Sequence, residues 1–207
     1  MVATRLTSSR TAYVPLPATG PYRGGEGLTT VVISDASAGR YLGLLEELAA
    51  GGGARLERGL AAEIAQSILL SEFGSAYAGA EVGTFLAARY QTDDGGLAVL
   101  PYASNDLETS AMVAIVAPDS VDRSALTAYL RGVVASPDST REGRMFALAG
   151  LAGLGEAVLP AIRAAAADPS LTIREQLMIA LGAVALGDAD TAQDLASTLV
   201  DAYGEAA

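Results

Sequence analysis

Two pairs of carboxylates lie close together within residues 90–112, and paired carboxylates are what acid–base catalysis requires. Asp93 and Asp94 precede two glycines, and one residue separates Asp106 from Glu108. Inverting glycosidases use two carboxyl groups about 6.5–9.5 Å apart, and some of these enzymes are α/α barrels. One hypothesis is therefore an enzyme acting on carbohydrate or isoprenoid substrates, with Asp93, Asp94 or Glu108 as the acid.

The same residues also suit a turn followed by a helix. Aspartate accepts hydrogen bonds from turn backbone and glycine adopts positive φ, so Asp-Asp-Gly-Gly is a common turn composition. Asp106 and Glu108 fall in the first turn of an expected helix, where the helix dipole favours negative charge. We therefore expect a turn and a helix cap, assign no catalytic residue, and expect the chain not to be an enzyme.

The composition excludes several other chemistries. The 207 residues contain no cysteine and no histidine. Thiolate nucleophiles, zinc–sulfur sites and Ser-His or Cys-His catalytic arrangements are therefore excluded. Carboxylate sites for hard ions such as Ca²⁺ would remain, but the ligand pattern of an EF-hand loop is absent. We assign neither a metal site nor a cofactor.

The charge balance is strongly acidic. There are 24 acidic residues against 13 basic ones, all of them arginine, which gives a net charge of −11. Binding to a phosphate backbone needs basic patches instead. No apolar run reaches the roughly 20 residues of a membrane-spanning helix, and no signal peptide is visible. We therefore expect no nucleic-acid partner and no membrane insertion.

The chain divides into a short arm and a helical domain. Residues 1–33 are rich in proline and glycine, and a β-branched run at residues 28–34 predicts one strand. Residues 34–207 have a helical pattern, so the expected fold is all-α with an extended N-terminal arm. The expected helices are 34–50, 55–72, 80–91, one from Asn105 to Ala117, 122–135, 140–153, 156–166, 172–186 and 189–203.

The second half of the sequence looks repetitive. Three alanine-rich apolar runs each follow a glutamate, with 34 residues from Glu108 to Glu142 and 33 from Glu142 to Glu175. A period of this size predicts an array of helical pairs. The leading helix of each pair is apolar nearly all round and should be buried, with the amphipathic trailing helix outside. We expect these layers to close into an α/α toroid; the same pairs left open would form a solenoid.

The segment "FLAARYQTDDGGLAVLPYASNDLETSAMVAIVA" resembles part of α-2-macroglobulin and complement-type thioester domains. There a helix is followed by glutamine, Asp-Gly-Gly, a short hairpin, an aspartate and a helix containing Thr-Ala. The order of elements over residues 28–203 is also similar, including a late apolar helix that ends in Leu-Gly-Asp. The matching positions are Gln91, Asp94, Gly95, Gly96, Pro101, Asp106 and Ala111.

One departure from that family bears on function. The thioester motif, a Cys-Gly-Glu-Gln element, should fall between the first two helices, where this chain has "GGGARLERG". Without the cysteine, no internal thioester forms and no target is captured covalently. The resemblance therefore implies a non-enzymatic packing and interaction domain of a larger, extracytoplasmic protein. The high alanine, glycine and arginine content and the absence of lysine suggest a GC-rich genome, so we expect that protein to be bacterial. Its partners would be other domains of that parent protein, proteases or surface proteins.

The segment around Gly95 is expected to be a hairpin joint at one rim of the helical domain. Gly95 and Gly96 would supply unusual dihedral angles, Pro101 would stiffen the exit, and Asn105 or Asp106 would cap the next helix. An open helical-repeat scaffold that binds protein remains a third hypothesis beside the thioester-like domain and the enzyme. The predicted binding patch consists of Asp93, Asp94, Tyr102 and Asp106.

Overall fold

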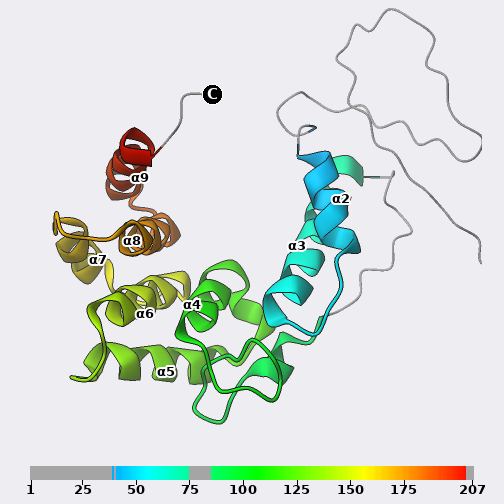
Figure 1. Cartoon of the computed structure of the whole chain (residues 1–207), viewed down its shortest axis with the longest axis horizontal. Coiled ribbons are helices and arrows are strands. Elements are labelled where there is room, and N and C mark those ends of the chain that lie inside the picture. Colours follow the sequence, from blue (N-terminus) through cyan, green and yellow to red (C-terminus); the bar gives the residue numbers. More distant parts are fainter. Residues whose placement is uncertain (1–38, 40, 75–84, 204–207) are drawn as a thin grey trace, which may run out of the picture. The chain divides into compact units, whose positions relative to one another are not determined.

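The computed structural model describes residue 39, residues 41–74 and residues 85–203, with side chains through residue 201. These residues form eight α-helices, two short 3₁₀-helices and no β-strand (Figure 1). The all-α prediction is confirmed for this part of the chain. Three predicted parts lie outside the described residues. They are the arm at 1–33 with its strand, the start of the helix expected at 34–50, and residues 80–84 of the helix expected at 80–91.

The chain forms two compact units, one of residues 1–53 and 58–85 and one of residues 54–57 and 86–207. In the first unit, α2 (Leu42–Ala50) packs against α3 (Leu56–Phe73), whose first two residues belong to the second unit. Leu42, Leu69 and Phe73 form the buried cluster between these two helices. These two helices agree with the predictions at 34–50 and 55–72.

The second unit contains three helical pairs arranged in two layers (Figure 1). In one layer, α6 packs between α4 and α8; in the other, α5 packs on α6, α7 on α6 and α8, and α9 on α8. Each helix lies within a few residues of its predicted position. The helices are α4 (Leu107–Val116), α5 (Arg123–Ala135), α6 (Arg141–Gly153), α7 (Leu159–Ala166), α8 (Ile173–Ala185) and α9 (Ala189–Tyr203).

The helix predicted at 80–91 differs from what is observed in its described part. A 3₁₀-helix, Ala87–Tyr90, takes its place. Gln91 then has an extended backbone (φ −77°, ψ 128°) and pairs with Leu97 in an antiparallel bridge. Because this pairing draws the chain into the following loop, the helical hydrogen-bond ladder ends before an α-turn is completed.

Side-chain caps explain where four of these helices begin. Asp106 accepts a hydrogen bond from the Thr109 amide at the start of α4. At the start of α5, Asp122 accepts hydrogen bonds from the amides of Ser124 and Ala125. Thr140 caps α6, and Thr172 caps α8 in a capping box completed by Glu175. Each such cap contributes about 1 kcal/mol. All four are cues that the sequence shows directly.

The inner helices α4, α6 and α8 approach each other closely at glycine–alanine contacts. A Cβ atom built on Gly150 would lie 3.1 Å from Ala111 Cα, and one built on Gly182 would lie 3.2 Å from Ala149 Cα. Gly182 follows Gly150 by 32 residues, the same interval that separates the caps of α6 and α8. Between α6 and α8 the structural repeat is therefore 32 residues, rather than the 33 indicated by the spacing of the glutamates. Between α4 and α6 the caps Asp106 and Thr140 are 34 residues apart, which is the interval predicted from Glu108 and Glu142.

Ion pairs link the outer helices at the same interval. Arg131 of α5 pairs with Glu156 ahead of α7. Arg163 of α7 pairs with Asp188 ahead of α9, with 2.7 Å between Arg163 Nε and Asp188 Oδ2. Both partners recur 32 residues later. Each arginine therefore ties one outer helix to the turn that starts the next, which fixes the register of the stack.

Replacing Gly153 with alanine should destabilise the second unit. Its new Cβ would lie 2.5 Å from the Ala114 carbonyl oxygen, so the backbones of α6 and α4 would have to separate. We expect a loss of about 1–3 kcal/mol in the free energy of unfolding, measured by urea denaturation. The matched control is Gly132→Ala, because a Cβ at Gly132 in α5 meets no atom within 4 Å. It should instead stabilise by about 0.5–1 kcal/mol; equal effects would contradict the close-packing account.

The Arg163–Asp188 pair should make stability depend on acid pH. Hydrogen bonds from Arg163 and then from the Thr191 hydroxyl lower the pKa of Asp188 from 3.8 to about 2. A carboxyl whose pKa is lower in the folded state stabilises the fold above its unfolded pKa, and that contribution is lost as the pH falls through the folded value. We therefore expect Asp188→Asn to be less stable than the parent at pH 6 and to lose less stability between pH 3.8 and 2.

Urea unfolding at several pH values across that interval measures the effect. Asp194→Asn removes an exposed carboxylate from α9 that takes part in none of the ion pairs described above, so it controls for the change in net charge. The prediction fails if Asp188→Asn follows the same pH dependence as the parent protein.

Candidate functional site: the loop between residues 91 and 106

The predicted hairpin joint is present as a short, closely bonded loop. Antiparallel bridges join Gln91 to Leu97 and Ala98 to Asn105. The loop is also anchored to residues 54–57 of the same unit, because the Leu56 amide donates to the Val99 carbonyl at 2.9 Å. These backbone contacts hold both arms of the loop in place.

The side chain of Gln91 fastens the loop to the start of α5. Its Nε2 donates to the Asp122 carbonyl at 2.9 Å and to the Gly95 carbonyl at 3.1 Å. Its Oε1 accepts from the Asp122 amide at 2.8 Å. The amide group therefore pairs with Asp122 on both sides, as a neighbouring strand would, and satisfies backbone groups that would otherwise need water.

Asp94 organises the interior of the loop. Its carboxylate accepts hydrogen bonds from the Thr92 hydroxyl at 2.6 Å, from the Gly96 amide at 3.1 Å and from the side-chain amide of Asn105. Charge-assisted hydrogen bonds of this kind are stronger than neutral ones. Asp94 is thus engaged in the turn itself, as the turn hypothesis expected.

The two glycines serve different purposes. Gly95 has φ +90°, a conformation that L side chains rarely adopt, so the prediction for Gly95 is confirmed. Gly96 does not have positive φ, and the prediction that it supplies an unusual dihedral angle is wrong. It is required for space instead, because a Cβ there would lie 2.8 Å from the Cβ of Asn105.

Tyr129 of α5 contacts the loop through its hydroxyl group. Its hydroxyl donates to Asn105 Oδ1 at 3.1 Å. Burial raises the pKa of Tyr129, and the charges of Asp94 and Asp106 raise it further. The phenol therefore keeps its proton and remains a hydrogen-bond donor.

Ser110 joins the loop to α4. Its hydroxyl accepts from the Leu97 amide at 2.8 Å and donates to the Asp106 carbonyl at 2.7 Å. The side chain is completely buried. A buried hydroxyl without partners would be costly, so this pair of bonds fixes the position of the loop against the helix.

Glu108, the second residue of the other acidic pair, is held in an ion pair. Arg174 of α8 places Nη2 2.6 Å from Glu108 and Nη1 3.2 Å from Glu142, at the starts of α4 and α6. The guanidinium also lies over the Phe146 ring, 5.3 Å from its centroid. Arg174 therefore connects the first turns of all three inner helices.

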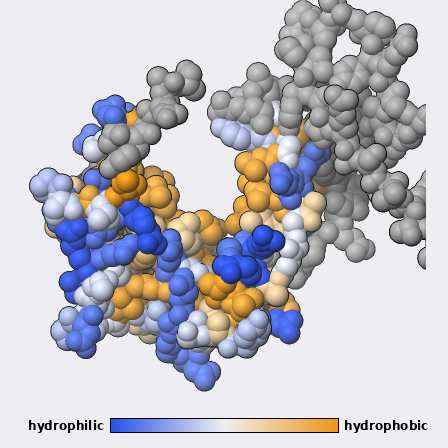
Figure 2. All heavy atoms as spheres, viewed as in Figure 1, coloured by the Kyte–Doolittle hydropathy of each residue, from blue (hydrophilic) through white to orange (hydrophobic). Residues whose placement is uncertain are grey.

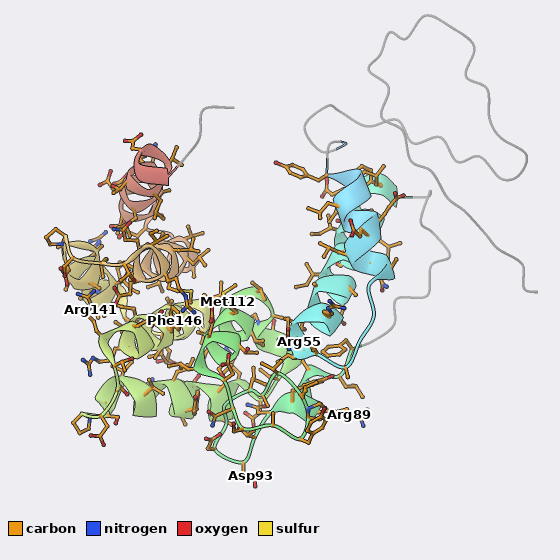
Figure 3. The ribbon with its side chains drawn as sticks, viewed as in Figure 1. Arg55, Arg89, Asp93, Met112, Arg141 and Phe146 are labelled. Atoms are coloured by element: carbon orange, nitrogen blue, oxygen red, sulfur yellow. The ribbon has the colours of Figure 1, made fainter. Side chains whose placement is uncertain are left out.

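The four residues of the predicted binding patch fall into two groups. Asp94 and Asp106 are engaged in the turn and the helix cap. Asp93 and Tyr102 are exposed, and Tyr102 retains 84% of its accessible surface. Figure 3 shows the Asp93 side chain at the tip of the loop, pointing away from the helices. Their binding role stays a prediction.

Three residues on which this site depends were not predicted to support it: Ser110, Tyr129 and Arg174. A serine inside an alanine-rich apolar helix signals a buried hydroxyl that needs partners. Nothing in the spacing indicates that Arg174 reaches back 66 residues to Glu108.

No family model, curated protein or solved structure matches the chain. The resemblance to thioester domains therefore stays a prediction. In the described part of the chain, no helix is both long and apolar enough to cross a bilayer. Those residues also contain no group of three potential metal ligands.

Two adjacent aspartates allow a direct test of this geometry. Asp94→Ala removes the acceptor of three hydrogen bonds and should destabilise the second unit by about 1–2 kcal/mol, discounted for solvent exposure. Asp93→Ala removes a carboxylate for which no bond is seen and should change stability by less than about 0.5 kcal/mol. Thermal unfolding followed by circular dichroism measures both. Equal losses would show that Asp94 does not organise the loop.

Proposed function

We propose that the chain is a non-catalytic protein-binding scaffold of helical pairs, which contacts its partner through Asp93 and Tyr102. The observation that carries this proposal is the contrast within the loop between bonded and exposed side chains. Gln91, Asp94 and Tyr129 hold the loop rigid, so binding would order little additional chain and lose little entropy. Tyrosine combines an apolar ring with a polar tip and is enriched at protein interfaces.

The state of the carboxylates favours a scaffold over an enzyme. An inverting glycosidase needs one carboxyl group for the leaving oxygen and another for a water molecule. Asp94 accepts three hydrogen bonds, Asp106 caps α4 and Glu108 is paired with Arg174. Only Asp93 of the four acids is left, and a single exposed carboxylate does not form such a pair.

The proposed setting follows from the resemblance to thioester domains. The chain would be a domain of a larger, extracytoplasmic bacterial protein, without covalent thioester chemistry. Its partners would be the other domains of that protein, proteases or surface proteins. The two-layered helical array is compatible with this proposal.

A more specific proposal for the fold is that this array closes into an α/α toroid. A closed ring gives every inner helix two neighbours. Val184 on α8 is 63% exposed, which favours the open arrangement of the helical-repeat hypothesis. Both arrangements place the residue 91–106 loop beside the start of α4, so the proposed binding residues are the same.

Binding can be tested with cationic trypsin whose catalytic serine is replaced by alanine. It stands for the protease class, and its positive charge complements a chain of net charge −11. We expect surface plasmon resonance to detect binding that the double variant Asp93→Ala/Tyr102→Ala weakens about tenfold or more, as removal of an interface anchor does.

Asp138→Ala provides the control, because it removes an exposed carboxylate from the turn between α5 and α6 and should leave the affinity unchanged. Absence of binding would reject proteases as partners. Binding that the double variant does not weaken would reject the loop as the contact surface.

A further inference from the structure

Asp94 and Gly95 form the only aspartate–glycine pair in the sequence. In such a pair the nitrogen of the second residue can attack the aspartate carboxyl, because glycine has no Cβ to hinder the approach. A bond forms between Gly95 nitrogen and Asp94 Cγ, and a carboxyl oxygen leaves as water with the amide proton. Water then opens the succinimide ring. Addition at Cγ restores aspartate, whereas addition at the main-chain carbonyl gives isoaspartate, in which the backbone runs through Cγ.

The folded loop engages both reacting groups in hydrogen bonds. The Gly95 amide donates to the Thr92 carbonyl at 2.9 Å, so its nitrogen is tied into the turn. One oxygen of the Asp94 carboxylate accepts from the Thr92 hydroxyl and the Gly96 amide, and the other accepts from the Asn105 side chain. The attack requires the amide to lose its proton and the carboxyl to turn toward the nitrogen. These hydrogen bonds must therefore break first.

Packing against α5 opposes the reaction as well. Gly95 is buried, and a Cβ built on it would lie 2.3 Å from the Ala125 carbonyl oxygen. The loop backbone therefore rests directly on the first turn of α5, and isoaspartate would add a methylene group to that backbone. Asp94 itself is exposed, and Figure 2 shows hydrophilic residues at the surface of this part of the loop. Because water reaches the carboxyl freely, the hydrogen bonds and the packing are what control the reaction.

We propose that Asp94–Gly95 is a site of spontaneous isomerisation to isoaspartate, which the folded loop suppresses and which local opening of the loop exposes. A reaction that needs an opened segment proceeds in proportion to the population of the open form. The added methylene group is incompatible with the hydrogen bonds of the turn, so each reaction converts a transient opening into a permanent one. This proposal does not depend on the binding function proposed for the loop.

Peptide mapping of the full 207-residue chain tests the proposal. The chain is incubated at neutral pH in native buffer and, in parallel, in guanidinium chloride that unfolds it. Isoaspartate has the same mass as aspartate, so the tryptic peptide of residues 90–123 is resolved by chromatography and the modified residue is located by electron-transfer fragmentation. We expect Asp94 to isomerise at least about tenfold more slowly in native buffer than in denaturant.

Two variants each remove one donor to the carboxylate and leave the Asp94–Gly95 sequence intact. Thr92→Val and, separately, Asn105→Ala should speed isomerisation at Asp94 about threefold or more in native buffer, the effect of one lost hydrogen bond. Their rates in denaturant should equal that of the parent chain. Asp138, which precedes serine in the exposed turn between α5 and α6, is the internal control and should react at the same rate in all three proteins.

Circular dichroism melting must show that the variants are folded at the incubation temperature. If Asn105→Ala does not fold, Thr92→Val decides, because it keeps the backbone carbonyl that accepts from the Gly95 amide. Equal rates at Asp94 in native buffer and denaturant would overturn the proposal, as would the absence of reaction in denaturant. So would folded variants that isomerise no faster than the parent chain, or an equal acceleration at Asp138.

Discussion

The close approach of the inner helices is the constraint on which the second unit depends. At each junction, one helix presents alanine and the next presents glycine, so backbone atoms meet where side chains would otherwise lie. Dispersion contacts between closely packed backbones are individually weak but numerous. Because larger side chains do not fit there, composition at a few positions determines the separation of the helices. The ion pairs Arg131–Glu156 and Arg163–Asp188 then fix the register of the outer helices, which the uniform alanine-rich surfaces do not specify.

A few residues also determine the conformation of the loop before α4. Backbone hydrogen bonds set the path of this hairpin, and side chains tie it to the neighbouring helices. Gln91 forms hydrogen bonds with the backbone amide and carbonyl of Asp122, and Asp94 accepts hydrogen bonds from three donors. Ser110 accepts a hydrogen bond from the Leu97 amide and so connects the loop to α4. The Asp94 carboxylate therefore holds the turn together through hydrogen bonds from three different residues.

Much of this fold could be predicted from sequence because its signals are local. Caps such as Asp106, Thr140 and Thr172 mark helix starts within a few residues, and the apolar pattern separates inner helices from outer ones. The described part of the helix expected at 80–91 was mispredicted because a local hairpin bridge, Gln91 with Leu97, overrides the helical pattern at its end. Long-range partners were not visible either. Arg174 reaches residues 32 and 66 positions earlier, and only the stacking of the helices brings them together. The glutamate spacing gave 33 residues between α6 and α8 because Glu142 is the second residue of its helix and Glu175 is the third.

The repeat also separates interior positions from terminal ones in a way that hydrophobicity does not. Ala152 and Val184 are both apolar and occupy equivalent positions, yet one is buried and the other is 63% exposed. Interior junctions need small residues because the neighbouring helix is already close. At α8, leucine and valine replace alanine at these positions, so a helix packing there would lie farther away and contact larger side chains. The change from alanine to leucine and valine at these two positions therefore changes how closely another helix could approach, while the hydrophobic character of both positions stays the same.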